Sequence, residues 1–105
     1  MDPVTLSNAR ETHQILDVRD PYEWHAGRID GAVHIPLQQL PVRLDEVDRG
    51  RPVAVVCRSG NRSALATNWL RQQGVDAHNV HGGVAAWAIH GLPLVSEDGR
   101  QGRVA

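Results

Sequence analysis

The stretch VAVVCRSGNRSALATNWL, residues 53–70, contains the only cysteine of the chain, Cys57. It begins with an uninterrupted apolar run, which is typical of a strand buried on both faces. A short polar loop with a glycine follows, and from Arg62 apolar residues recur at helical spacing until Gly74 ends the pattern. The stretch therefore predicts a buried strand, a tight loop and a helix, with the cysteine where the strand meets the loop.

The same alternation continues on both sides of this stretch. We expect further strands at residues 13–18, 31–36 and 75–80, and helices at residues 5–11, 21–26, 37–47 and 82–91. Asp20 and Pro21 suit a helix start, and Pro41 should break the segment 37–47. Alternating strands and helices predict an α/β fold with a mainly parallel sheet between helical layers. We expect one domain at residues 1–95 and a polar, flexible tail at residues 96–105.

Composition narrows the classes of function. The chain of 105 residues has a net charge of -1, which offers no electrostatic basis for binding nucleic acid or an anionic membrane. No apolar run approaches the roughly 20 residues that a membrane span needs, and no secretory signal pattern is present at the start. A single cysteine excludes an intrachain disulfide framework. We therefore expect a cytoplasmic protein.

The six histidines do not form a recognisable metal site. His78 and His81 lie three positions apart at a strand-to-loop junction, with no cysteine or carboxylate at ligand spacing. We therefore expect no metal.

The loop after Cys57 has the composition of an anion-binding cradle. Gly60 permits backbone angles closed to other residues, so successive N–H groups can point inward, and the next helix adds its own unpaired N–H groups. Because a parallel sheet gathers chemistry at the carboxyl ends of its strands, Cys57 is well placed to react. We predict Cys57 as the nucleophile, with a thiol pKa lowered by these donors. The predicted substrate or anion contacts are Arg58, Ser59, Gly60, Asn61, Arg62 and Ser63.

Two other interpretations of the cysteine fit the sequence less well. Unpaired cysteine is often simply a buried core residue, but a core residue needs neither the glycine loop nor the flanking arginines. A cysteine phosphatase requires arginine six positions after the cysteine, where this chain has Ser63; Arg62 comes one position earlier. The loop is thus one residue too short to bind phosphate as a cysteine phosphatase does. A small sulfur electrophile remains a plausible substrate. Without a second cysteine, a disulfide relay within the chain is excluded.

Two charged residues at the end of the first strand are weaker candidates. Asp17 and Arg19 could reach the active-site side of the sheet as supporting residues, although a structural ion pair is the favoured interpretation. Glu23 is expected on the solvated face of a short helix.

At this point the sequence resembles the single-domain rhodaneses, the thiosulfate sulfurtransferase family. The resemblance rests on ILDVRDPYEWHAGRIDGAVHIP (residues 15–36), VVCRSGNRSALA (55–66) and NVHGGVAAWAIHGLP (79–93), and it extends over residues 14–94. Arg28 and His34 depart from the family's usual histidine and asparagine, in a structural segment. The resemblance implies a three-layer sandwich with a five-stranded, mostly parallel sheet. It also implies that Cys57 carries the sulfur, with Arg58 and Arg62 contacting the anion.

The family's chemistry would make the protein a sulfurtransferase. A sulfane sulfur would pass from thiosulfate or a related donor to a Cys57 persulfide, and then to cyanide, a thiol or a protein partner. No cofactor beyond this covalent intermediate is expected, and we expect a monomer or weak dimer. The alternative is a non-enzymatic rhodanese-like module that binds persulfide or has a regulatory role.

Overall fold

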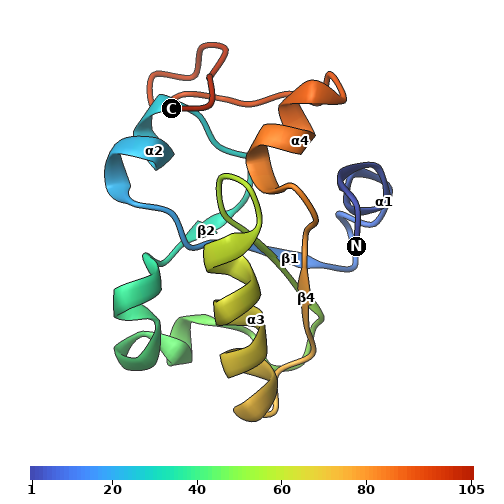
Figure 1. The fold of residues 1–105 in the computed structure, drawn as a ribbon, viewed down its shortest axis with the longest axis vertical. Helices are drawn as coiled ribbons and strands as arrows, with labels where there is room; N and C mark the ends of the chain where they lie inside the picture. Colours follow the sequence, from blue (N-terminus) through green and yellow to red (C-terminus); the bar gives the residue numbers. More distant parts are fainter.

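Four parallel strands form one sheet in the computed structural model, which describes residues 1–105 (Figure 1). In chain order they are β1 (Gln14–Asp17), β2 (Val33–His34), β3 (Val53–Val56) and β4 (Ala77–Asn79), and across the sheet the order is β2-β1-β3-β4. The α-helices are α1 (Pro3–Asn8), α2 (Pro21–Ala26), α3 (Asn61–Gln72) and α4 (Gly83–Ile89). Two short 3-10 helices, η1 (Leu37–Val42) and η2 (Leu44–Glu46), lie between β2 and β3.

Strand β3 is the inner strand that the apolar run predicts. All four of its residues are buried, and it pairs in parallel with β1 on one side and β4 on the other. Its register sets Val56 opposite Asp17 and Val55 opposite Asn79. The carboxyl ends of these three strands therefore lie at the same edge of the sheet, where the cysteine follows.

Side chains of β3 alternate between two hydrophobic cores. Val53 and Val55 join the core beneath α3 and the 3-10 helices, with Leu70 among its members. Ala54 and Val56 face the other core, which holds residues of α1 and α4 such as Trp87. This period of two is what a strand buried on both faces requires. The α/β sandwich with helices on both faces is confirmed.

The sheet has four strands instead of the five that the resemblance implies. The only further pairings are isolated antiparallel bridges, Arg28 with Val95 and Val95 with Gln101, each too short to make a strand. The segment 37–47 also differs in detail. It is split into two 3-10 helices, but at Arg43; Pro41, which was expected to break the segment, lies inside the first of them. Pro41 has no backbone N–H to donate, so a regular α-helix is not formed across it and only short 3-10 turns remain.

The C-terminal segment, for which the sequence predicts a flexible tail, folds back onto the domain. The Arg103 N–H donates to the carbonyl oxygen of Ala26 at 3.0 Å, and Gly102 donates to Leu94 at 2.9 Å. Figure 1 shows the chain end beside α2, far in sequence but near in space. Gly27 makes this approach possible, since a Cβ there would lie 2.3 Å from the Arg103 carbonyl oxygen.

Candidate active site

Cys57 directly follows β3 and lies at the base of the loop, with only 1% of its surface exposed. Its sulfur accepts a hydrogen bond from the Gly60 N–H at 3.0 Å. The hydroxyl of Ser63 lies 3.2 Å from the same sulfur. The loop thus curls around the sulfur, as the sequence predicts, and presents polar hydrogen to it.

Gly60 gives the loop its shape. Its φ of 109° lies in the region that L side chains rarely adopt, and it is the N-cap residue of α3. In this conformation its N–H points at the Cys57 sulfur while its carbonyl oxygen accepts the Ala64 N–H of the first turn of α3. One residue therefore both turns the chain towards the sulfur and begins the helix.

The first turn of α4 supports the loop from beneath. The N–H groups of Val84 and Ala85 donate to the carbonyl oxygens of Cys57 and Arg58, at 2.8 and 2.9 Å. Gly83 allows this contact, because a Cβ there would lie 2.2 Å from the Cys57 carbonyl oxygen. The loop backbone is therefore fixed by two helices.

The pKa of the Cys57 thiol is lowered from its ordinary value. Burial acts to raise it, because the charged thiolate loses water. Hydrogen bonds from the Ser63 hydroxyl and from the backbone N–H groups of Ser63, Gly60 and Ser59 act in the opposite direction and outweigh burial. The loop therefore favours the thiolate, which is the nucleophilic form of cysteine.

Arg62, one of the two predicted anion contacts, is held by Glu23 of α2. Its two terminal nitrogens lie 2.7 and 2.9 Å from the two carboxylate oxygens, and Asp20 lies 3.9 Å away. These hydrogen bonds lower the pKa of Glu23 and raise that of Arg62. The expectation that Glu23 lies on a solvated face is wrong, since its side chain is 2% exposed. The signal was present: Glu23 stands three positions after Asp20, and both complete a capping box around Pro21.

The other loop residues lie towards solvent. Arg58, Ser59 and Asn61 are exposed, and Asn61 opens α3. The Arg58 Nε donates to the carbonyl oxygen of Ala105 at 2.9 Å. Of the predicted set, the structure thus brings Gly60, Ser63 and the backbone N–H of Ser59 to the sulfur, and it engages both arginine side chains elsewhere.

Asp17 and Arg19 form a fully buried ion pair at the carboxyl end of β1. The Arg19 Nη2 lies 2.7 Å from one Asp17 carboxylate oxygen and also donates to the Gly27 carbonyl at 2.7 Å. The pair therefore ties the end of β1 to the turn after α2. This is the structural pairing that the sequence analysis favoured.

Asn79 is a site residue that the sequence analysis missed. Its side-chain oxygen accepts the Ser63 hydroxyl at 2.6 Å, and its side-chain nitrogen donates to the Gly60 carbonyl at 3.3 Å. The signal was its position at the carboxyl end of β4, the strand beside β3. A polar residue at that place must lie near the residues that follow β3.

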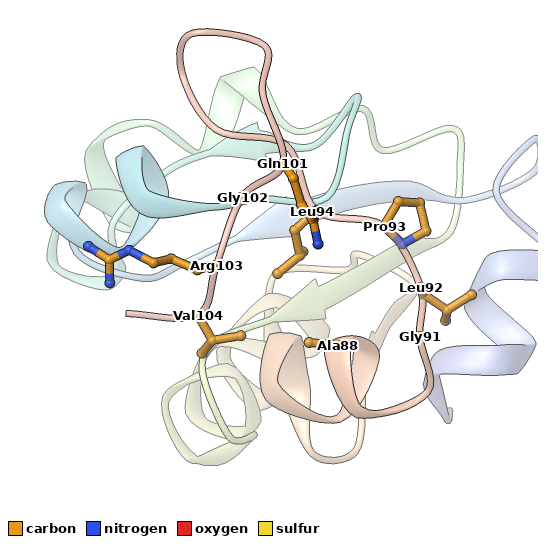
Figure 2. Close-up of a pocket in the computed structure, with 9 residues that line it drawn as sticks. All are labelled: Ala88, Gly91, Leu92, Pro93, Leu94, Gln101, Gly102, Arg103 and Val104. Atoms are coloured by element: carbon orange, nitrogen blue, oxygen red, sulfur yellow. The ribbon is translucent and has the colours of Figure 1, made fainter.

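The largest cavity does not contain the sulfur. It has a volume of about 430 Å³ and lies between the end of α4 and the C-terminal segment (Figure 2). Its lining residues are Ala88, Gly91, Leu92, Pro93, Leu94, Gln101, Gly102, Arg103 and Val104. In Figure 2 the Arg103 side chain points away from the cavity, so its backbone forms that wall. None of the predicted site residues lines this cavity.

No group of three or more His, Cys, Asp or Glu side chains is placed to hold a metal ion. No helix has the length and apolar character that crossing a bilayer would require.

Comparison with known proteins identifies the family. The rhodanese-like domain family matches residues 2–90. A protein named sulfurtransferase from Allochromatium vinosum is 42% identical over 86 residues, which are 81% of this chain and 80% of that protein. The crystal structure of a rhodanese-related protein from Thermoplasma volcanium superposes with a TM-score of 0.89 at 34% identity, covering 92% of this chain and 97% of the other. A rhodanese-like domain protein from Staphylococcus aureus gives a TM-score of 0.79, also at 34% identity, over 83% and 88% of the two chains. With the family matched over most of its length and the cysteine loop in place, the chain belongs to the rhodanese-like domain family.

Proposed function

We propose that the protein is a sulfurtransferase that carries sulfane sulfur on Cys57. The observation that carries the proposal is the Cys57 sulfur itself, which accepts the Gly60 N–H in a loop that lowers its pKa. Further support comes from the relative named sulfurtransferase at 42% identity.

In the first half-reaction the Cys57 thiolate attacks the outer sulfur of a donor such as thiosulfate. A bond forms between the two sulfurs, the donor's own S–S bond breaks, and sulfite leaves with that electron pair. The loop N–H groups and the start of α3 offer positive partial charge to the departing anion. Arg62 keeps its charge while paired with Glu23, and it interacts electrostatically with Cys57.

In the second half-reaction a nucleophile takes the outer sulfur from the persulfide. Attack by cyanide would form thiocyanate and return the electron pair of the persulfide bond to Cys57, which again becomes a thiolate. Because Cys57 is the only cysteine, no second thiol of the chain can resolve the persulfide. The acceptor must therefore come from outside, as a small thiol or a protein partner.

A non-enzymatic persulfide-binding module is the second candidate. It is favoured by the burial of Cys57 and by the engagement of both arginines, which leaves the loop with backbone donors. Such a module would take up sulfur without turning it over. The two candidates differ in the second half-reaction.

The test is to incubate the protein with thiosulfate and measure its intact mass, then to add cyanide and measure thiocyanate. We expect the mass of one added sulfur atom, lost again with cyanide, and continued thiocyanate formation. Cys57→Ser should show neither. A stable persulfide without turnover would support the module instead. No added sulfur with thiosulfate, polysulfide or a low-molecular-weight persulfide would contradict both.

A further inference from the structure

Three side chains form a hydrogen-bonded chain that leads away from the sulfur. The Cys57 sulfur contacts the Ser63 hydroxyl, and that hydroxyl contacts the side-chain oxygen of Asn79 at 2.6 Å. The Asn79 amide nitrogen then returns to the Gly60 carbonyl, within the same loop. Ser63 is fully buried, and its hydroxyl has the Cys57 sulfur and the Asn79 side chain as partners.

The Gly60 carbonyl fixes the direction of these hydrogen bonds. A carbonyl oxygen can only accept, so the Asn79 atom that faces it must be the amide nitrogen, which donates. The Asn79 oxygen therefore faces Ser63 and can only accept. Ser63 has one hydroxyl proton, and it is given to Asn79. With the hydroxyl in this orientation the Ser63 oxygen is an acceptor towards Cys57, which suits a thiol S–H. The part of the lowered Cys57 pKa that comes from the Ser63 hydroxyl therefore requires that the hydroxyl turn its proton to the sulfur.

We propose that Asn79 is a positioning residue that controls the ionisation of Cys57 by competing for the Ser63 proton. While Asn79 holds this proton, the neutral thiol is favoured, because it can donate to the Ser63 oxygen. When Cys57 ionises, Ser63 must turn its proton to the sulfur, and the Asn79 oxygen loses its partner. The effect of this control on sulfur transfer rests on the proposed function of Cys57 as nucleophile. The ionisation of Cys57 itself does not, because it can be measured without any sulfur transfer.

Other charged groups surround the loop but do not share this proton. They are Arg58 in the loop, Arg62 of α3 with Glu23 and Asp20 beside α2, Asp17 and Arg19 at the end of β1, His78 in β4, His81 after it, and the Met1 amino group, which donates to the backbone carbonyl of Asn79 at 2.8 Å. None of them hydrogen-bonds to the Ser63 hydroxyl or to the Asn79 amide. Removal of the Asn79 side chain leaves the side-chain contacts of these groups in place.

The test measures the rate of Cys57 alkylation by iodoacetamide, a neutral reagent, as a function of pH. In Asn79→Ala the Ser63 proton is free to turn to the sulfur. A hydrogen bond to a charged group is strong enough to move a pKa by about one pH unit. We therefore expect the midpoint of the alkylation rate against pH to fall by about one pH unit relative to the unmodified protein. Asn79→Leu, which keeps the volume but has no acceptor, should give the same fall.

A second background separates this role from a structural one. In Ser63→Ala there is no proton to compete for, so adding Asn79→Ala should leave the midpoint unchanged. Asn68→Ala, which removes an exposed asparagine of α3, serves as the matched control and should not move it. An unchanged or raised midpoint in both single Asn79 variants would overturn the proposal, as would an equal fall in the Ser63→Ala background. Because no sulfur donor is used, these outcomes differ from a failure of sulfur transfer.

Discussion

Gly83 shows how a single residue can hold the active-site loop in place. It has a φ of 59°, and its missing side chain lets the start of α4 approach the backbone of Cys57 and Arg58. The two hydrogen bonds from the first turn of α4 to these carbonyls depend on that approach. Here glycine is needed for space as well as for its backbone angle.

The substitution Gly83→Ala tests this need for space. Gly91→Ala is the matched control, since Gly91 has a similar positive φ of 74° but nothing within 4 Å of an added Cβ. We expect Gly91→Ala to lower the free energy of unfolding by about 1 kcal/mol, from backbone strain alone. Gly83→Ala should lower it by about 3 kcal/mol or more, and persulfide formation should slow as the loop shifts.

Urea unfolding and intact mass after thiosulfate treatment measure the two effects. Equal losses of stability in the Gly83 and Gly91 variants would show that the close packing against Cys57 contributes nothing.

The Glu23–Arg62 ion pair joins α2 to the start of α3. The side chain of Glu23 is 2% exposed and that of Arg62 is 35% exposed, so the pair lies between a surface ion pair and a fully buried one. Glu23 also closes the capping box of α2 by accepting the Asp20 N–H at 3.1 Å. The Glu23 carboxylate thus stabilises the start of α2 and holds the start of α3 against it.

Replacing this carboxylate by an amide should weaken the junction. In Glu23→Gln the Arg62 charge loses its partner, and we expect the free energy of unfolding at about pH 7 to fall by about 2 kcal/mol, between the values typical of exposed and buried pairs. Glu46→Gln is the matched control, because Glu46 pairs with Arg43 on the surface, and it should change stability little. Equal effects of the two substitutions would contradict the argument.

The loss of unfolding free energy in Glu23→Gln should depend on pH in one direction. The pKa of Glu23 is lowered in the folded protein, so the ion pair stabilises the fold above the pKa of an unfolded glutamate, about 4.3. That contribution is lost as the pH falls through the lowered folded value. The difference between the unmodified protein and Glu23→Gln should therefore shrink on acidification. A difference that persists in strong acid would assign the effect to packing.

Local sequence pattern predicted those parts of the fold and of the site that depend on residues close together in the chain. Apolar runs located all four strands, and the loop composition located Cys57 with Gly60 and Ser63 around it. Side-chain contacts between residues far apart in the sequence could not be predicted from such patterns. Arginine next to a reactive cysteine suggests an anion contact, yet Arg62 finds a carboxylate thirty-nine positions earlier. Asn79 was missed for the same reason, because only the sheet order brings it to the loop.

The C-terminal segment illustrates the same limit most clearly. Its polar composition, rich in glycine and charge, predicts a flexible tail. In the structure its backbone fits against Gly27 and Ala26, and its last residue accepts a hydrogen bond from Arg58. A polar segment can dock in this way when backbone groups make the contacts. Such contacts cannot be predicted from hydropathy, which depends on the side chains.

The substitution Gly27→Ala should release this segment without unfolding the domain. Gly27 has extended backbone angles that alanine also adopts, so the only conflict is between the new Cβ and the Arg103 backbone at 2.3 Å. We expect trypsin to cleave after Arg100 and Arg103 several-fold faster, as followed by mass spectrometry. Gly50→Ala, whose Cβ would meet only the Asp48 side chain at 3.2 Å, is the control. Cleavage as fast in the unmodified protein as in Gly27→Ala would mean that the segment is free in solution, as its composition alone predicts.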